Sequence, residues 1–300
     1  MLNEEGIVEA MVERLSAALA SVDPDWGIVF VDDGSTDATW RLMSEAAARN
    51  PRVRALRLSR NFGQHTAITA GLEATDADWV VVLDGDLQDR PEVIPDLHAK
   101  ASEGFDVVFV ERTDRPEGRL YKLAQRLFYG GLRALSGTTY NPAHGNFSIL
   151  SRRVVEAYAS LEEGTRFYGG LVAWLGFRHA SLPARHGERH AGAPSYNLMR
   201  RVRLAQDIIL SFSTRPLLIA VLLGFACTAF SFLYGAWIVG RALLGGVPVE
   251  GWASLIVSIY FVGGMLMTML GLNSLYMGRV HRELQRRPLY VVSERAGAAE

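Results

Sequence analysis

The chain has one cysteine and almost no net charge, and both shortages exclude classes of protein. Cys227 alone cannot form an internal disulfide, and its apolar surroundings indicate a small buried side chain rather than a catalytic thiol. The 31 lysines and arginines nearly cancel the 32 aspartates and glutamates, so the net charge of −1 gives no reason to expect a nucleic-acid partner. The first residues are acidic and lack the apolar core of a cleavable signal peptide.

Long apolar runs are absent before residue 216, but two follow. Residues 217–239 and 255–277 are each roughly twenty or more mainly apolar residues, which is enough to span a bilayer. The loop between them holds a single basic residue, Arg241, whereas several arginines flank the pair on its outer sides. The positive-inside rule therefore predicts a multi-pass protein of the cytoplasmic membrane with both chain ends in the cytoplasm. The flanking arginines are Arg200, Arg201, Arg203, Arg215, Arg279, Arg282, Arg286 and Arg287.

Strands and helices alternate along the chain before residue 112. Short apolar runs rich in β-branched residues predict strands over residues 26–31, 53–58, 78–83 and 105–110. Segments with helical spacing of apolar residues cover 7–15, 39–49, 64–74 and 91–103. This order is typical of an α/β fold with a parallel sheet built from βαβ units.

An acidic turn follows the third predicted strand. Because open α/β sheets bind ligands beyond the carboxyl ends of their strands, this turn lies at the expected ligand site. Asp84, Asp86 and Gln88 offer hard oxygen ligands to one Mg²⁺ or Mn²⁺ ion, which also takes diphosphate oxygens. Taken alone, such a pattern is more often a solvated acidic turn, and only the other motifs of the chain favour the metal.

A second acidic turn, residues 32–37, closes the first predicted strand and opens a helix. One interpretation is that Asp33 or Ser35 caps that helix. The other is that Asp33 hydrogen-bonds a nucleobase or ribose, as acidic residues do in nucleotide-binding folds. Near the start of the chain, Asn3 is a candidate N-cap of the first helix. Arg112 and Arg115 follow the fourth strand, where an arginine fork can bind a phosphate, although most arginines are surface residues without such a role.

Four motifs together resemble a known family. Leu2-Asn3-Glu4-Glu5, residues 32–37, Arg60-Asn61-Phe62-Gly63-Gln64 and residues 84–89 match the family-2 glycosyltransferases in order and spacing. The resemblance is strongest to the dolichyl- and bactoprenyl-phosphate sugar transferases and covers nearly the whole chain. It implies a Rossmann-like GT-A domain with a mostly parallel sheet over residues 1–195 and an interfacial helix over 196–215. A two-helix transmembrane hairpin over 216–278 and a cytoplasmic tail over 279–300, disordered from residue 293, would follow.

The resemblance also implies the roles of individual residues. Nucleotide-sugar binding is expected of Leu2, Asn3, Glu4, Asp33 and Asp84, and metal binding of Asp84, Asp86 and Gln88. Asp86, Arg112 and Arg115 are the expected catalytic residues, with the arginines holding the acceptor phosphate or the donor diphosphate. A flexible loop is expected to cover the phosphates through Arg185, Arg189, Ser195 and Tyr196.

Two departures from the family pattern bear on function. In the family an apolar strand precedes the Asn-Glu motif, so we expect that strand to be missing here, leaving two strand edges and a core face exposed. Asn146 stands where many inverting members have an aspartate, and an amide cannot take a proton. A phosphate acceptor tolerates this substitution because it is already anionic at pH 7.

The expected activity is inverting, metal-dependent transfer of a sugar from a UDP- or GDP-sugar to polyprenyl (undecaprenyl) phosphate at the cytoplasmic membrane face. Two alternatives stay open: an impaired or non-catalytic membrane-bound homologue, and a membrane glycosyltransferase with another acceptor. A processive polysaccharide synthase is disfavoured because the chain has no Gln-x-x-Arg-Trp motif. Gly263, Gly264 and Gly271 could allow close helix packing and homo-oligomerisation, although such glycines are common in ordinary spans.

Overall fold

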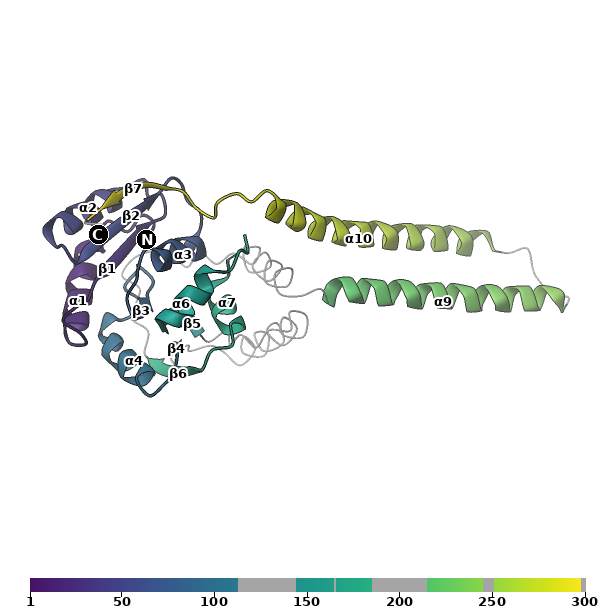
Figure 1. The fold of residues 1–300 in the computed structure, drawn as a ribbon. Helices are drawn as coiled ribbons and strands as arrows, with labels where there is room; N and C mark the ends of the chain where they lie inside the picture. Colours follow the sequence, from purple (N-terminus) through teal and green to yellow (C-terminus); the bar gives the residue numbers. More distant parts are fainter. Residues whose placement is uncertain (113–143, 165, 185–214, 245–250, 298–300) are drawn as a thin grey trace. The chain divides into compact units, whose positions relative to one another are not determined.

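The computed structural model describes residues 1–112, 144–164, 166–184, 215–244 and 251–297. It divides the chain into two compact units. The first unit combines the N-terminal part of the chain with residues 287–300, and the second contains residues 199–286 with a short piece of the preceding chain. Figure 1 shows the first unit as a mixture of strands and helices, and the second as two long helices.

The first unit begins with the alternation that the sequence predicts. Its elements are α1 (Val8–Ala20), β1 (Ile28–Asp32), α2 (Thr39–Arg49), β2 (Val53–Leu58), α3 (Gln64–Glu73), β3 (Trp79–Val82), η1 (Pro91–Val93), α4 (Ile94–Ala101) and β4 (Val107–Arg112). They agree with the predicted strands and helices to within a few residues at most boundaries. Five elements follow that the periodicity did not indicate: β5 (His144–Ser151), α6 (Arg152–Ala159), α7 (Tyr168–Trp174), β6 (His179–Ala184) and β7 (Val292–Ala296).

The strands form two mixed sheets, with the orders β1-β2-β7 and β3-β5-β4-β6. β1 pairs with β2 and β4 pairs with β6 in parallel, as βαβ units require. β5 and β7 pair antiparallel with their neighbours. The α/β class is therefore confirmed, but the sheets are mixed rather than mostly parallel, because β5 and β7 run antiparallel to the strands beside them.

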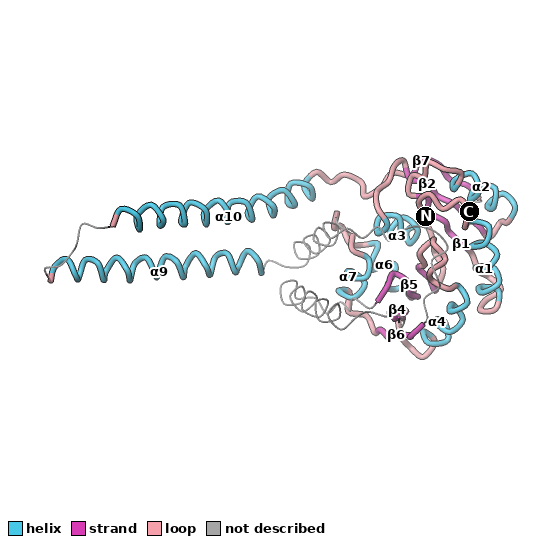
Figure 2. The backbone as a smooth tube through the Cα atoms, turned by 180° about the vertical axis from the view of Figure 1, so that it is seen from behind, coloured by secondary structure: helices cyan, strands magenta, loops and turns pink. Residues whose placement is uncertain are grey.

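The C-terminal residues are ordered, so the prediction of a disordered tail from residue 293 is wrong for residues 293–297. β7 lies along β2 in antiparallel register, from Ala55 opposite Ala296 to Leu58 opposite Val292, as Figures 1 and 2 show from opposite sides. This pairing covers an edge of β2 that would otherwise present unpaired backbone groups. The last strand of the chain is thus part of the first unit, although the two long helices precede it.

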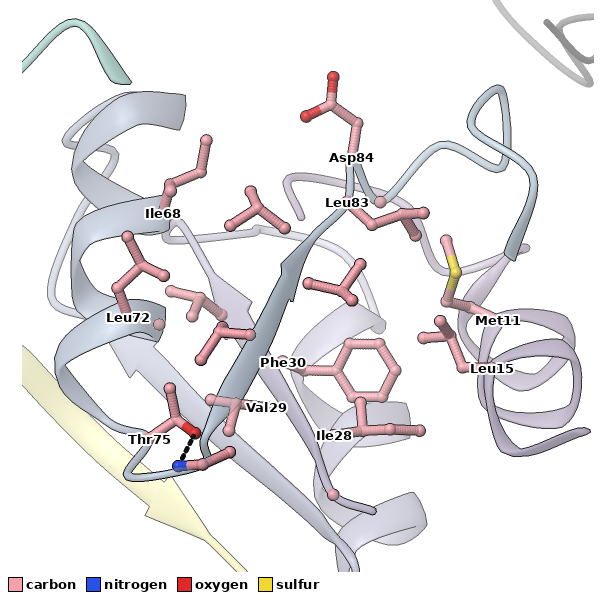
Figure 3. A pocket seen from close by; sticks show the side chains of 18 of the residues that line it. Met11, Leu15, Ile28, Val29, Phe30, Ile68, Leu72, Thr75, Leu83 and Asp84 are labelled. Atoms are coloured by element: carbon pink, nitrogen blue, oxygen red, sulfur yellow. Dashed lines mark hydrogen bonds between the residues drawn. The ribbon is translucent and has the colours of Figure 1, made fainter. Parts of the chain in front are cut away.

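A cavity of about 1080 Å³, lined by both apolar and acidic residues, separates β1 from β3, which belong to different sheets. Figure 3 shows its lining, with Phe30 of β1, Leu15 of α1 and Leu72 of α3 pointing inward. At one end the Met1 amino group donates to the Val31 carbonyl at 2.6 Å, and the Asp33 amide donates to the Met1 carbonyl at 2.9 Å. These two bonds form one bridge of a parallel ladder beside β1.

Helices cover the sheets through one apolar stripe each. On α1, Val8, Met11 and Leu15 recur at helical spacing, and all three are buried. Tyr158 of α6 and Tyr168 of α7 are completely buried with their rings 5.8 Å apart, and each hydroxyl has a hydrogen-bond partner, Thr69 or Ser148. This core supports β5, whose first residues reach the candidate site.

The second unit consists of α9 (Arg215–Leu243) and α10 (Trp252–Leu284). Each contains a segment long and apolar enough to cross a membrane, Leu217–Trp237 and Ser258–Leu284. The two helices lie side by side in both views, and Gly224 of α9 lies against Met269 of α10. Large apolar side chains such as Phe225 and Phe232 are exposed, at 70% and 77%, which suits a surface that faces lipid rather than water.

Candidate active site

The candidate site is assembled by the register of β5. In the antiparallel pairing Val82 of β3 lies opposite Ser148, and Glu111 of β4 lies opposite His144. The first residues of β5 therefore lie between the carboxyl ends of β3 and β4. This is the edge at which α/β sheets bind ligands.

Two amides hold the first carboxylate of the acidic turn. Gln64 Nε2 lies 2.7 Å and Asn146 Nδ2 3.2 Å from the same oxygen, Oδ1 of Asp84. Figure 3 shows the Asp84 side chain directed away from the apolar lining of the cavity. These two hydrogen bonds fix the direction of the carboxylate, so Asp84 is oriented before any ligand binds.

The second carboxylate shapes the turn itself. Asp86 Oδ1 accepts a hydrogen bond from the Gln88 amide at 3.0 Å, which is an Asx turn. Between them Leu87 has a φ of +57° and a buried side chain, so the backbone turns sharply while its apolar side chain remains in the core.

The donor set suits a hard cation that shares its ligands with a substrate. No group of three or more His, Cys, Asp or Glu residues that could hold a metal occurs in the described part of the chain. Mg²⁺ is commonly bound through one or two carboxylates plus substrate phosphates and water, rather than by an all-protein cage. The carboxylates of Asp84 and Asp86, with the side-chain carbonyl oxygen of Gln88, fit that mode of binding.

Asp33 joins two of the motifs. Its carboxylate accepts hydrogen bonds from the Phe62 amide at 2.7 Å and the Gly63 amide at 2.9 Å, and the residue is only 4% exposed. The Asp33 carboxylate therefore holds residues 60–63 against the turn after β1 instead of capping α2. Gly34 lies inside this contact: its φ is +77°, and a Cβ there would lie 2.6 Å from the Arg60 carbonyl carbon. Contact between Asp33 and a nucleobase stays a prediction.

The Leu2-Asn3-Glu4 segment packs onto the same turn. The Asn3 amide donates to Ser35 Oγ at 2.9 Å, and Asn3 Oδ1 accepts from the Thr36 amide at 2.9 Å. The prediction that Asn3 caps the first helix is therefore wrong, because its side chain instead serves a backbone donor of the turn. Leu2, Glu4, Asp33, Asp84 and Asp86 all line the one cavity, so the structure brings these predicted residues together.

Comparison with known proteins agrees with this geometry. Residues 1–159 match glycosyl transferase family 2. An uncharacterized glycosyltransferase of Synechocystis is 35% identical over 98% of this chain and 93% of its own length. The chain belongs to glycosyl transferase family 2.

Other relatives of this glycosyltransferase carry more specific names. The SfII prophage-derived bactoprenol glucosyl transferase of Shigella flexneri is 38% identical over 89% of this chain and 87% of its own length. A prophage bactoprenol glucosyl transferase homolog of Escherichia coli is 37% identical over 88% of this chain and 87% of its own length. Among solved structures, glucosyl-3-phosphoglycerate synthase from Mycobacterium tuberculosis has 22% identity and a TM-score of 0.49, covering 71% of this chain and 76% of that one. The part of the first unit that matches the family model, residues 1–159, is thus a family-2 glycosyltransferase domain.

The predicted phosphate-binding arginines of this glycosyltransferase follow neighbouring strands. β4 ends at Arg112 and β6 ends at Ala184, and these two residues are partners in the parallel register. The backbone of Arg112 is thereby placed at the ligand edge. The other residues predicted to bind phosphate, and the predicted interfacial helix over 196–215, lie outside the described residues: Arg115, Arg185, Arg189, Ser195 and Tyr196.

Sequence reasoning missed several side chains at the site. Gln64 was recognised only as part of a motif, and its bond to Asp84 depends on how α3 packs. His65, the next residue, meets the ring of Phe167 edge-on at 5.3 Å. Burial lowers the pKa of His65, and the nearby Asp84 carboxylate partly offsets this effect, so the imidazole is neutral near pH 7. No signal in the sequence distinguished this histidine from an ordinary core residue.

Proposed function

We propose that this glycosyltransferase moves a sugar from a UDP- or GDP-sugar to polyprenyl phosphate, of the undecaprenyl class, at the cytoplasmic face of the membrane. The observation that carries the proposal is the bond between Asp84 and Asn146. An amide stands beside the donor carboxylate, where a transferase acting on a sugar hydroxyl would need a proton acceptor. A phosphate acceptor needs no such base. The relatives named bactoprenol glucosyl transferases support this choice of acceptor.

The donor would lie along the polar end of the cavity. Leu2, Asn3 and Glu4 with the turn after β1 would receive the nucleoside, because these backbone segments already lie together. A Mg²⁺ or Mn²⁺ ion held by Asp84, Asp86 and Gln88 would supply positive charge against the departing diphosphate. Gln64 and Asn146 would keep Asp84 directed toward that position.

The reaction would be a single displacement. An oxygen of the lipid phosphate attacks the anomeric carbon, the bond from that carbon to the nucleoside diphosphate breaks, and the configuration inverts. Arg112 would hold the attacking phosphate in line, since a guanidinium fork matches phosphate geometry. The backbone position of Arg112 at the end of β4, opposite Ala184 at the end of β6, supports this role.

The membrane part of the proposal rests on the second unit. α9 and α10 each contain a segment long enough to span, and their exposed apolar side chains favour lipid. Arginines concentrate outside the two spans, which favours a cytoplasmic catalytic domain. A lipid-linked acceptor is consistent with an enzyme anchored in this way.

A second candidate is a membrane-bound homologue that binds donor without transferring sugar. The observation that favours it is the cavity between β1 and β3, because an unfilled space beside the donor site weakens the support of that site. This candidate predicts nucleotide binding without turnover, which a transfer assay separates from the first.

The test uses the full chain in membrane vesicles containing undecaprenyl phosphate. Radiolabelled UDP- and GDP-sugars are added with Mn²⁺, with Mg²⁺ or with EDTA, and lipid-linked sugar is extracted. Radiolabelled sugar should be transferred to the lipid from either the UDP-sugars or the GDP-sugars. EDTA should abolish this transfer. Asp86→Ala should also abolish it without unfolding the domain. Asp76→Ala, at the amino end of β3, is the matched control and should retain transfer. Full transfer in EDTA, or sugar attached to an alcohol oxygen, would disprove the proposal.

A further inference from the structure

The C-terminal strand β7 and the residue before it form hydrogen bonds with the β2 segment in addition to the backbone ladder. Besides its ladder with β2, the segment forms two specific bonds: the Ser59 amide donates to the Val291 carbonyl at 2.8 Å, and Ser293 Oγ donates to the Arg57 carbonyl at 3.1 Å. Gly297, which follows β7, has a φ of +88°, and a Cβ there would lie 2.6 Å from the Val53 carbonyl oxygen. The register of β7 on β2 is therefore fixed at both ends of the strand.

Glu294 of β7 contacts side chains of both β2 and α2. Glu294 accepts a hydrogen bond from Arg57 Nη1 at 2.7 Å on one carboxylate oxygen, and from Trp40 Nε1 at 3.1 Å on the other. Both oxygens are thus used by groups of the N-terminal half of the domain. The carboxylate of Glu294 is half exposed, so it remains in contact with water.

The same guanidinium supports the turn after β1. Arg57 Nη2 donates to the Ser35 carbonyl at 3.3 Å, and Arg57 Nε lies 3.4 Å from Asp32 Oδ2. Asp32 is completely buried, its other oxygen accepts from the Ser35 amide, and Oδ2 has no hydrogen-bond partner. Burial costs a carboxylate its hydration, and nearby cations or hydrogen bonds must compensate for that loss. The Arg57 guanidinium and the Met1 ammonium group are cations that interact with Asp32.

The supported turn belongs to the candidate donor site. Ser35 Oγ accepts the Asn3 amide, and Asp33 of the same turn holds the amides of Phe62 and Gly63. A continuous series of contacts therefore runs from Glu294 through Arg57 to the residues expected to hold the nucleoside. Glu294 is 237 residues beyond Arg57 and follows both membrane-length helices.

Edge protection alone does not account for this arrangement. A strand that merely covers β2 needs only backbone pairing, whereas here a carboxylate anchors the one arginine that also contacts Asp32 and Ser35. A half-exposed ion pair contributes little to global stability. Its removal should then alter the donor turn more than it alters unfolding.

We infer that Glu294 of the C-terminal strand is a positioning residue for the nucleotide donor, acting through Arg57 on the turn formed by residues 32–36. The inference depends on the proposed function only in naming a nucleotide as the ligand. It means that the segment after the last membrane-length helix completes the donor site. Loss of Glu294 leaves the fold intact but lets Arg57 leave Asp32 and the Ser35 carbonyl.

The experiment compares Glu294→Gln with Glu45→Gln in the full chain in detergent. Glu45 is the matched control, because it accepts from Arg41 at the same 2.7 Å on the outer surface of α2. Hydrogen exchange of the amides of residues 32–36 is measured without ligand, and binding of UDP and GDP with Mn²⁺ is measured by calorimetry. Glu294→Gln should speed exchange at these amides and weaken nucleotide binding about 3- to 10-fold, with little change in thermal midpoint. Glu45→Gln should match the wild type.

A second comparison tests whether Glu294 acts through Arg57. Adding Glu294→Gln to Arg57→Gln should change neither exchange nor binding further, and the donor KM should rise in the single variants while the acceptor KM stays constant. Wild-type exchange at residues 32–36 in Glu294→Gln would overturn the inference. Absence of nucleotide binding by the wild type would instead contradict the proposed function, and the exchange measurement would still decide this inference.

Discussion

Asn146 Nδ2 lies 3.2 Å from Asp84 Oδ1, and this bond joins the start of β5 to the turn that follows β3. The antiparallel register places the two residues side by side, since Val82 lies opposite Ser148. Gln64 donates to the same carboxylate oxygen from α3. The Asp84 carboxylate is thus oriented by two neutral amides.

Replacing Asn146 with aspartate should make the domain dependent on a divalent cation for full stability. Two carboxylates about 4 Å apart repel by about 1 kcal/mol in water and about 4 kcal/mol at an effective dielectric of 20. In EDTA, Asn146→Asp should therefore unfold at a lower temperature than Asn146→Leu, which removes the donor without adding charge. Mn²⁺ should raise the midpoint of the aspartate variant more than that of the wild type. Equal midpoints of the two variants in EDTA would mean that residue 146 does not lie against Asp84.

Arg112→Ala should impair use of the lipid acceptor more than binding of the donor. A charge-assisted bond from a guanidinium to phosphate is worth about 1.5–3 kcal/mol, so the acceptor KM should rise at least about 10-fold. Arg112→Lys should recover only part of the loss, because an ammonium cannot bind a phosphate bidentately. The control is Arg52→Ala. Arg52 precedes the amino end of β2, away from the carboxyl ends of the strands where the candidate site lies, and it stacks on Trp26. Unchanged acceptor kinetics in Arg112→Ala would remove this residue from the site.

Gly34→Ala should weaken nucleotide binding and destabilise the domain. The new Cβ would meet backbone atoms of Arg60 and Asn61 at 2.6 and 2.8 Å, and a backbone φ of +77° is unfavourable for alanine. We expect a loss of about 1–3 kcal/mol in unfolding free energy and displacement of residues 60–63 from Asp33. Calorimetry and thermal unfolding measure the two effects. Gly6→Ala, where a Cβ meets nothing within 4 Å, should leave both unchanged.

Glu92→Gln should remove one source of acid sensitivity. Arg14 donates to both oxygens of Glu92 at 2.8 Å, and these hydrogen bonds lower the pKa of Glu92 below its ordinary value of 4.5. The folded state then binds fewer protons than the unfolded state, so the pair stabilises the fold above pH 4.5 and loses its effect as the pH falls through the lower folded pKa.

The pair is partly exposed, which limits its contribution to less than about 1 kcal/mol at pH 7. Glu92→Gln should therefore unfold slightly earlier than the wild type at pH 7, and this difference should shrink as the pH falls below 4.5, measured in detergent at matched ionic strength. Glu13→Gln on the same helix as Arg14 is the control. A difference between Glu92→Gln and the wild type that does not shrink below pH 4.5 would contradict the ion-pair explanation.

Local sequence patterns were sufficient for the first half of the catalytic domain. The strands β1 to β4 and their helices were predictable because apolar periodicity and β-branched runs report burial directly. The pattern failed for β7, whose residues Val292–Ala296 show exposed positions through most of the strand. This strand forms because β2 offers an open edge, which is a property of the assembled sheet and not of the segment.

The sequence also identified the residues of the candidate site but not their hydrogen-bond partners. The acidic turns and the asparagine at position 146 can be read from residue order, because strand ends and turn residues mark the ligand edge of an α/β sheet. The partners of those residues cannot be read in this way. Asp33 binds amides of the loop after β2, Asp84 binds Gln64 and Asn146, and Glu294 binds Arg57.

The amino-acid sequence by itself determined the α/β class, the two membrane-length helices and the carboxylates of the donor turn, since each depends on residues close together in the chain. Only the tertiary structure decided the mixed sheets, the cavity between β1 and β3, and the contact of the C-terminal strand with Arg57, which in turn contacts the turn after β1. These features depend on strand register and on edges that exist only after the chain has folded.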